Sequence, residues 1–197
     1  LHGVVREIEQ AGGRALAVPT DVRQEGSVEA LARRALAEWR QVDILVNAAG
    51  VATFAPVTDS KLDDWDQMLA VNLRGAVLCC RAVLPAMIGR RRGSIINVGS
   101  VVTSRSLLGS AGYTASKYGL LGFSRVLAEE MRPHGVRVGV ISAGATDTPL
   151  WDAMPGAPDR ERMLRADQVA EAALLMAGLG PNATLEEVTL LPAGGIL

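Results

Sequence analysis

The sequence has 197 residues, which suits one domain and is long enough to bury a core. Its apolar fraction of 49% and charged fraction of 21% are those of an ordinary globular protein. A net charge of −1 offers no electrostatic footprint for nucleic acid or an anionic membrane, and no continuous apolar run reaches the ~18 residues of a membrane span. We therefore expect neither nucleic acid nor a membrane as a partner.

Helical and strand-like patterns alternate through the first half of the chain. The apolar spacing predicts helices over residues 1–11, 26–40 and 61–89. It predicts strands over residues 14–22 and 43–50, and the second of these runs into a turn of small residues.

The second half of the chain continues this alternation. We predict strands over residues 94–100, 136–144 and 186–195 and helices over 112–131 and 167–178. Five strands separated by helices predict an α/β fold, a Rossmann-like doubly wound parallel sheet with helices on both faces.

Because the alternation runs throughout, residues 1–197 are predicted to form a single domain. The exception is the weakly patterned, Pro- and Gly-rich stretch over 148–166, which we predict to be a substrate loop. Trp151, Met154 and Met163 in it favour a partly apolar pocket, although packing in a core or a lid explains them equally well.

Cysteine usage indicates the cellular compartment. The only two cysteines, Cys79 and Cys80, are adjacent, with no His, Asp or Glu at ligand spacing. Neither a metal site nor a disulfide framework is expected. We interpret the pair as buried thiols in a reducing compartment and predict a cytoplasmic protein.

The carboxyl ends of four predicted strands carry small and polar residues. In sheets of this kind ligands bind beyond those ends, and small side chains let a ligand approach the backbone. Four such turns at one edge of a sheet favour a ligand site over simple turn formation. The residues are Asp21, Asn47-Ala48-Ala49-Gly50, Gly99-Ser100 and Ala143-Gly144.

Tyr113 and Lys117 stand one helical turn apart, although the chain has only two residues of each type. Residues at i and i+4 share a helix face, so the lysine ammonium and the positive end of the helix dipole are expected to lower the tyrosine pKa. A tyrosine tuned in this way can act as a general acid/base. An isolated pair of this kind is more often a surface tyrosine stacked on a lysine stem, so other residues must decide.

Ser100 and Asn72 supply the further polar groups. Ser100 ends a buried strand, where its hydroxyl can point into the crevice, and Asn72 lies in the middle of the long predicted helix. Neither His2 nor His134 is placed to activate a serine nucleophile, so hydrolysis is disfavoured.

Together these residues resemble the short-chain dehydrogenase/reductase superfamily over essentially the whole chain. Ser100, Tyr113 and Lys117 match the family's catalytic Ser–Tyr–Lys run, and Asn72, in VNLRG, matches its catalytic Asn. LVNAAG matches the stretch after the family's fourth strand, ISAGATDTP the stretch after its sixth, and Asp21-Val22 the pair that flanks the adenine. The match is specific because order, spacing and context agree.

The resemblance implies an NAD(P)(H)-dependent oxidoreductase that interconverts a carbonyl and an alcohol of a small molecule by hydride transfer, with NAD or NADP as cofactor. Tyr113 would be the general acid/base and Ser100 would hold the substrate oxygen. Lys117 would bind the nicotinamide ribose, and Asn72 would hold a water in the proton relay. The implied cofactor-binding residues are Asp21, Val22, Asn47, Ala48, Ala49, Gly50, Tyr113, Lys117, Thr146 and Thr148.

The sequence departs from the family pattern in three places. Ala48 and Ala143 stand where the family commonly has Asn and Pro. The chain also begins in what matches the helix after the family's second strand, so the first strand, its glycine turn, the helix and the second strand have no counterpart. In the family's sheet those two strands lie between the strands at 14–20 and 43–47. Without them two central ladders have no partner, and we expect an incomplete Rossmann domain from a longer protein.

Two other functions remain open. One is a dinucleotide-binding scaffold or sensor of the same fold that has lost catalysis, against which the four catalytic residues argue. The other is an enzyme of this fold that catalyses dehydration or epimerisation, although such relatives usually carry larger C-terminal substrate regions.

The two longest predicted helices suggest an assembly. Each is apolar on more than one face, and a second apolar stripe needs another partner. In the family that the chain resembles, these helices form the interfaces, so we expect a homodimer or homotetramer. The residues of the second stripes are Ala76, Cys79 and Cys80 on the first helix and Leu120, Phe123 and Leu127 on the second.

Overall fold

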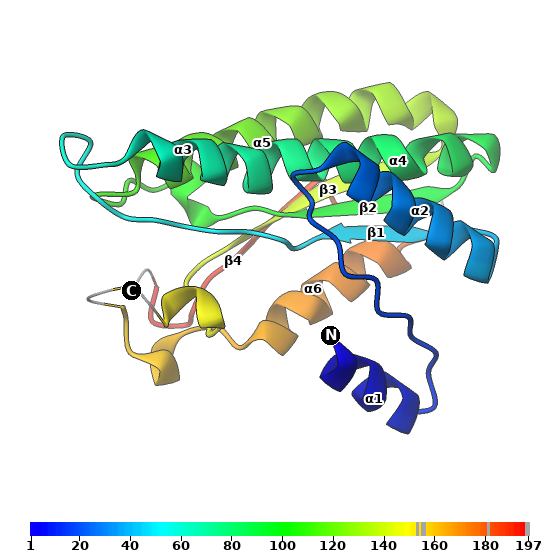
Figure 1. Cartoon of the computed structure of the whole chain (residues 1–197), viewed down its shortest axis with the longest axis horizontal. Coiled ribbons are helices and arrows are strands. Elements are labelled where there is room, and N and C mark those ends of the chain that lie inside the picture. Colours follow the sequence, from blue (N-terminus) through cyan, green and yellow to red (C-terminus); the bar gives the residue numbers. More distant parts are fainter. Residues whose placement is uncertain (153, 155–156, 181, 196–197) are drawn as a thin grey trace.

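The computed structural model describes residues 1–152, 154, 157–180 and 182–195. A four-stranded parallel sheet lies between two helical layers, which confirms the predicted doubly wound α/β architecture (Figure 1). The strands lie side by side in their sequence order. They are β1 (Ile44–Asn47), β2 (Gly93–Val98), β3 (Val136–Ala143) and β4 (Glu187–Leu190).

Helices cover both faces of this sheet. On one face α4 (Ala76–Gly89) packs on β1 and β2, and α5 (Ala111–Met131) packs on β3. On the other face α6 (Ala166–Gly178) packs on β2 and β3. In the outer part of the first layer, α2 (Glu25–Trp39) packs against α4.

The first helix, α1 (His2–Gln10), lies on the α6 side of the molecule and buries none of its residues (Figure 1). Its apolar Val4 and Ile8 are 57% and 39% exposed. The predicted amphipathic helix therefore forms, but its apolar stripe stays uncovered among the described residues.

The strand predicted over residues 14–22 does not form, and that prediction was wrong. These residues run as an irregular, partly buried segment between α1 and α2. A strand must share its N–H and C=O groups with a neighbouring strand, and no described strand lies on the outer edge of β1. Accordingly, Ile44 and Val46 of β1 remain 47% and 45% exposed. Four of the five predicted strands form, and the one predicted over residues 14–22 does not, because it lacks a partner strand.

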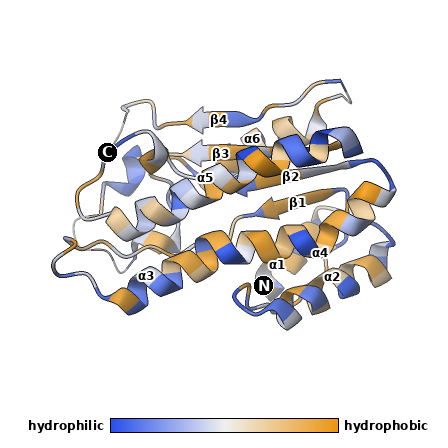
Figure 2. Ribbon diagram, turned by 90° about the horizontal axis from the view of Figure 1, so that it is seen from above, coloured by the Kyte–Doolittle hydropathy of each residue, from blue (hydrophilic) through white to orange (hydrophobic). Residues whose placement is uncertain are grey.

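The helix predicted over residues 61–89 forms, with one widened turn in its middle. It consists of α3 (Leu62–Leu69), a π-helical turn over Ala70–Gly75, and α4. The combined helix is long and apolar enough to cross a membrane, since its most apolar 18-residue stretch has a mean hydropathy of 1.5. Figure 2 shows that α4 is the more hydrophobic part and that α3 carries hydrophilic residues as well. Length and composition are weak evidence here, because Cys80 and Met87 are completely buried against the sheet, as in the core helix of a globular domain.

The core lies on both sides of the central strands. In β2, Ile95 belongs to the apolar cluster under α4 and α5, whereas Ile96 packs with Met176 of α6 on the opposite face. The residues predicted to form second apolar stripes on the long helices belong largely to this interior. Ala76, Cys79, Cys80, Leu120 and Leu127 are all buried within the chain, so that argument for an assembly was wrong.

Candidate active site

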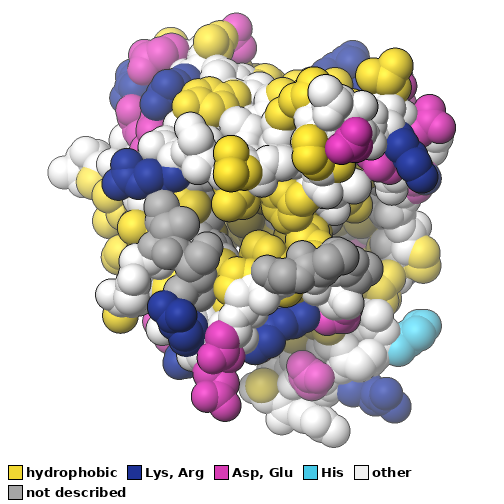
Figure 3. Space-filling model, turned by 90° about the vertical axis from the view of Figure 1, so that its left-hand side faces the viewer, with side chains coloured by type: hydrophobic (Ala, Val, Ile, Leu, Met, Phe, Trp, Pro, Cys, Tyr) yellow, Lys and Arg dark blue, Asp and Glu magenta, His cyan; other side chains and the backbone are white. Residues whose placement is uncertain are grey.

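A cavity of about 380 Å³ opens at the carboxyl ends of the strands. Figure 3 looks onto this end of the molecule and shows hydrophobic side chains gathered in a hollow, with charged side chains around its rim. A pocket of this size and character is typical of a small-molecule site. The described wall includes Ala48, Gly50, Phe54, Ser100, Val102, Arg105, Leu107, Tyr113, Lys117, Thr146, Thr148, Leu150 and Trp151.

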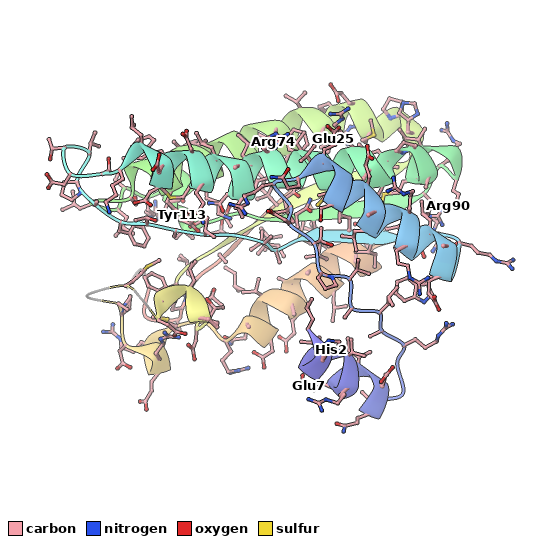
Figure 4. The ribbon with its side chains drawn as sticks, in the orientation of Figure 1. His2, Glu7, Glu25, Arg74, Arg90 and Tyr113 are labelled. Atoms are coloured by element: carbon pink, nitrogen blue, oxygen red, sulfur yellow. The ribbon has the colours of Figure 1, made fainter. Side chains whose placement is uncertain are left out.

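Tyr113 and Lys117 enter the cavity from the first two turns of α5, as predicted. Tyr113 lies at the opposite end of the molecule from Arg90, which follows α4 (Figure 4). Lys117 is buried, and its Nζ donates a hydrogen bond to the Val98 carbonyl oxygen at 2.8 Å. Its ammonium stands 5.7 Å from the centroid of the Tyr113 ring. The i, i+4 spacing therefore brings the ammonium next to the aromatic ring, and both side chains line the cavity.

Burial controls the ionisation of both side chains. It raises the pKa of Tyr113, and the hydrogen bond with the Ser100 hydroxyl acts in the opposite direction with a smaller effect. The predicted lowering of this pKa was therefore wrong for the protein without ligands. Burial also lowers the pKa of Lys117 from 10.5 to about 8, because the ammonium is removed from water.

Ser100 follows β2 and begins the short 3₁₀ turn over Val101–Thr103. Its Oγ accepts a long hydrogen bond of 3.4 Å from the Val102 N–H and lines the cavity together with Tyr113. The hydroxyl therefore reaches the crevice, as the position of Ser100 at a strand end predicted.

Asn72 lies in the π-helical turn and is 1% exposed. Its Oδ1 accepts the Val51 N–H at 2.9 Å, while its Nδ2 donates to the Val51 carbonyl and to the Ser116 Oγ, each at 2.9 Å. The Ser116 hydroxyl in turn donates to the Tyr113 carbonyl oxygen at 2.7 Å. Asn72 thus ties the loop after β1 to the helix that carries Tyr113. π-Turns are frequent at functional sites, and the predicted catalytic role of Asn72 stays a prediction.

The residues expected to bind a cofactor divide into two groups. Ala48, Gly50, Thr146 and Thr148 line the cavity together with Tyr113 and Lys117. Asp21, Val22, Asn47 and Ala49 are not part of its described wall.

Three of these four side chains outside the wall have other partners. The Asp21 carboxylate accepts from Arg23 Nε at 2.9 Å, and this hydrogen bond lowers the Asp21 pKa. Val22 packs beside the apolar cluster of Val28. Asn47 Nδ2 donates to Asn97 Oδ1 at 2.8 Å, so it links β1 to β2.

Sequence patterns missed Phe54, which joins Tyr113 and Trp151 in an aromatic wall of the cavity. The Phe54 ring meets the Tyr113 ring edge-on with centroids 5.9 Å apart and stacks on the Trp151 ring at 6.2 Å. Phe54 follows the NAAG turn by four residues, and only that proximity could have indicated it. Of the three apolar residues considered in the 148–166 stretch, Trp151 lines the cavity, Met163 is buried away from its described wall, and Met154 is outside that wall.

Lys117 is the clearest place for a bound group. An ammonium has three N–H donors, and only the one to the Val98 carbonyl oxygen has a partner among the described residues. Ala48 and Gly50 leave the neighbouring backbone open to a ligand. A buried ammonium with free donors beside open backbone suits a group with adjacent hydroxyls, such as the ribose of a nicotinamide cofactor.

Comparison with known proteins identifies the family. Residues 1–157 match a family model described as short chain dehydrogenase. The chain belongs to this family. Its relatives include the D-threitol dehydrogenase of Mycolicibacterium smegmatis, 40% identical over 166 residues, which cover 80% of this chain and 64% of that protein. The match thus spans less than two thirds of the length of this relative.

In two further relatives the match covers a larger share of the relative's own length. The cis-4-hydroxycyclohexanecarboxylate dehydrogenase of Sinomonas cyclohexanicum is 35% identical over 183 residues, which cover 88% of this chain and 74% of that protein. The crystal structure of a metagenomic short-chain oxidoreductase in complex with NADP superposes with a TM-score of 0.83 at 35% identity, covering 98% of this chain and 80% of that one. The family assignment made from sequence motifs is therefore confirmed.

Proposed function

We propose that this chain carries the catalytic centre of an NAD(P)(H)-dependent oxidoreductase that interconverts a carbonyl and an alcohol, with Tyr113 as the general acid/base. One observation carries the proposal: Ser100, Tyr113 and Lys117 meet at one cavity with a largely apolar wall. The names of the relatives support it, since they are dehydrogenases of alcohols such as D-threitol and cis-4-hydroxycyclohexanecarboxylate. The cofactor is NAD or NADP.

A bound nicotinamide would supply or accept the hydride. In the reducing direction, the hydroxyls of Ser100 and Tyr113 would both donate hydrogen bonds to the substrate oxygen and so hold the carbonyl in place. Tyr113 would then give its proton to that oxygen as negative charge develops on it. Lys117 would hold the ribose with its free N–H donors, and its positive charge would stabilise the phenolate left behind.

The raised pKa of Tyr113 bears on the direction of the reaction. Because burial disfavours the phenolate, Tyr113 stays protonated at neutral pH and is ready to act as an acid. Alcohol oxidation needs the phenolate instead. A cofactor carrying a positive charge on its nicotinamide ring would favour that form when it is bound nearby.

Assembly and localisation form a second part of the proposal. On α5 the exposed Tyr118, Gly122 and Val126 recur every four residues and so share one helix face, with Tyr118 and Val126 52% and 60% exposed. This apolar stripe, rather than the residues first considered, supports a homodimer or homotetramer. The buried free thiols Cys79 and Cys80 support a reducing compartment such as the cytoplasm.

Tyr113→Phe in the natural gene product tests the catalytic assignment. The replacement keeps the ring and removes the proton, so turnover should fall by ~10²–10⁴-fold, the usual contribution of a positioned acid/base. Binding of NAD or NADP, followed by calorimetric titration, should persist. D-Threitol and cis-4-hydroxycyclohexanecarboxylate are the first substrates to assay.

Tyr118→Phe is the matched control, because Tyr118 lies on the same helix but is exposed. It should leave turnover unchanged. If Tyr113→Phe kept near-normal turnover, the acid/base assignment would be wrong. A protein that binds the cofactor but turns over no alcohol or ketone would favour the scaffold or sensor.

A further inference from the structure

The charged residues on the cavity wall are all of one sign. Of the described residues that line it, Lys117 and Arg105 carry charge, and none is an aspartate or glutamate. Low-dielectric walls that carry one sign of charge concentrate ligands of the opposite sign. The electrostatics of the cavity therefore favour a substrate with a negative group.

Arg105 is carried by the same turn as Ser100. The Arg105 N–H donates to the Val101 carbonyl oxygen at 2.9 Å, one residue after Ser100. This bond fixes the backbone of Arg105 relative to the hydroxyl that would hold the substrate oxygen. The side chain of Arg105 therefore starts from a fixed point near Ser100 and lines the same cavity.

The guanidinium of Arg105 is free to bind a ligand. Its one hydrogen bond is a long contact of 3.4 Å from Nη1 to the Ser104 carbonyl oxygen, and no described carboxylate pairs with it. Arg160, in the neighbouring loop, differs because its guanidinium is engaged by Asp147 and Asp152. Lys117 is buried, and the proposed function assigns its free donors to the cofactor ribose, so Arg105 is the exposed cation on the described part of the wall.

The rest of the wall suits an apolar body. Phe54, Val102, Leu107, Leu150 and Trp151 line the cavity between and around the polar groups. We infer that Arg105 selects, as substrates, small carbonyl compounds and alcohols with an apolar body and a carboxylate at the end away from the reacting oxygen. The inference rests on the proposed function, because it takes the cavity at Tyr113 as the substrate site. The planar fork of the guanidinium matches a carboxylate through two parallel hydrogen bonds.

The test compares two ketones that differ in one carboxylate, 4-oxocyclohexanecarboxylate and cyclohexanone. In the natural gene product, Arg105→Met should lower kcat/KM for the charged ketone by about tenfold, mainly by raising KM. The effect is of this size because a charge-assisted hydrogen bond to an exposed arginine contributes a free energy at the low end of the range for such bonds. For cyclohexanone, kcat/KM should stay within about twofold of the unmutated value. This ketone has no carboxylate, so it makes no contact with Arg105 that the substitution could remove.

Arg92→Met is the matched control for loss of positive charge. Arg92 is exposed immediately before β2, at the amino end of the sheet and thus away from the cavity. This control variant should reduce both ketones like the unmutated protein. If Arg105→Met slowed both ketones equally, or neither, the inference would be overturned while the proposed oxidoreductase function stood.

Binding measurements, which do not depend on turnover, test this inference separately from the proposed function. Calorimetric titration should show that cyclohexanecarboxylate binds the unmutated protein more tightly than cyclohexanol does, and that Arg105→Met removes the difference. If no ketone were reduced but this preference persisted, the catalytic proposal would fail, whereas Arg105 would still be the group that binds carboxylates in this cavity. Equal binding of both compounds by the unmutated protein would overturn the selection of carboxylates.

Discussion

Lys117→Met should make the folded protein more stable at neutral pH although it damages the site. Burial lowers the pKa of Lys117 from 10.5 to about 8. At about 1.4 kcal/mol per pKa unit, holding the charge inside costs the folded state about 3 kcal/mol. Methionine has a similar length and no charge, and the variant loses the hydrogen bond to the Val98 carbonyl oxygen, which contributes about 1 kcal/mol. The net gain is about 2 kcal/mol at neutral pH.

This gain should depend on pH in a defined direction. Because the folded pKa lies below the unfolded one, the unfolded chain binds more protons between about pH 8 and 10.5. The free energy of unfolding of the unmutated protein should therefore rise through that window, as the penalty on the charged lysine disappears. The advantage of Lys117→Met is largest below the folded pKa and shrinks toward the upper end of the window.

Urea unfolding of the natural gene product without cofactor measures both effects, at neutral pH and near the top of the window. Lys61→Met is the control, because Lys61 is the only other lysine of this sequence and is exposed. It should change stability little at either pH. A Lys117→Met variant less stable than the unmutated protein at neutral pH, or a gain independent of pH, would refute the reasoning.

Two further predictions concern Tyr113 and the assembly. The ultraviolet difference titration between the unmutated protein and Tyr113→Phe, without cofactor, should place the Tyr113 pKa above that of free tyrosine, since burial disfavours the phenolate. A Tyr113 pKa below that of free tyrosine would show that the positive charge of Lys117 affects this pKa more than burial does. Light scattering should report a dimer or tetramer at micromolar concentration, and Val126→Glu on the exposed α5 stripe should shift it toward the monomer. A monomeric unmutated protein would contradict this proposal.

Local spacing in the sequence was enough to predict the helices and the central pair of the site. Tyr113 and Lys117 share a helix face because a helix repeats every 3.6 residues, and this depends only on the chain around them. Ser100 reaches the cavity because it comes two residues after the end of β2, and parallel strands present their carboxyl ends at one edge of the sheet. These features follow from short-range geometry, and the structure confirms them.

Contacts between distant segments decided the rest. Residues 14–22 have a strand-like pattern but remain irregular, because a strand forms only where another strand takes its hydrogen bonds. The pKa of Tyr113 moves opposite to the local expectation, because burial depends on everything packed around the ring and not on the lysine four residues later. Arg105 and Phe54 lie on loops without periodicity, so only the folding of these loops over the sheet edge brings them to the cavity.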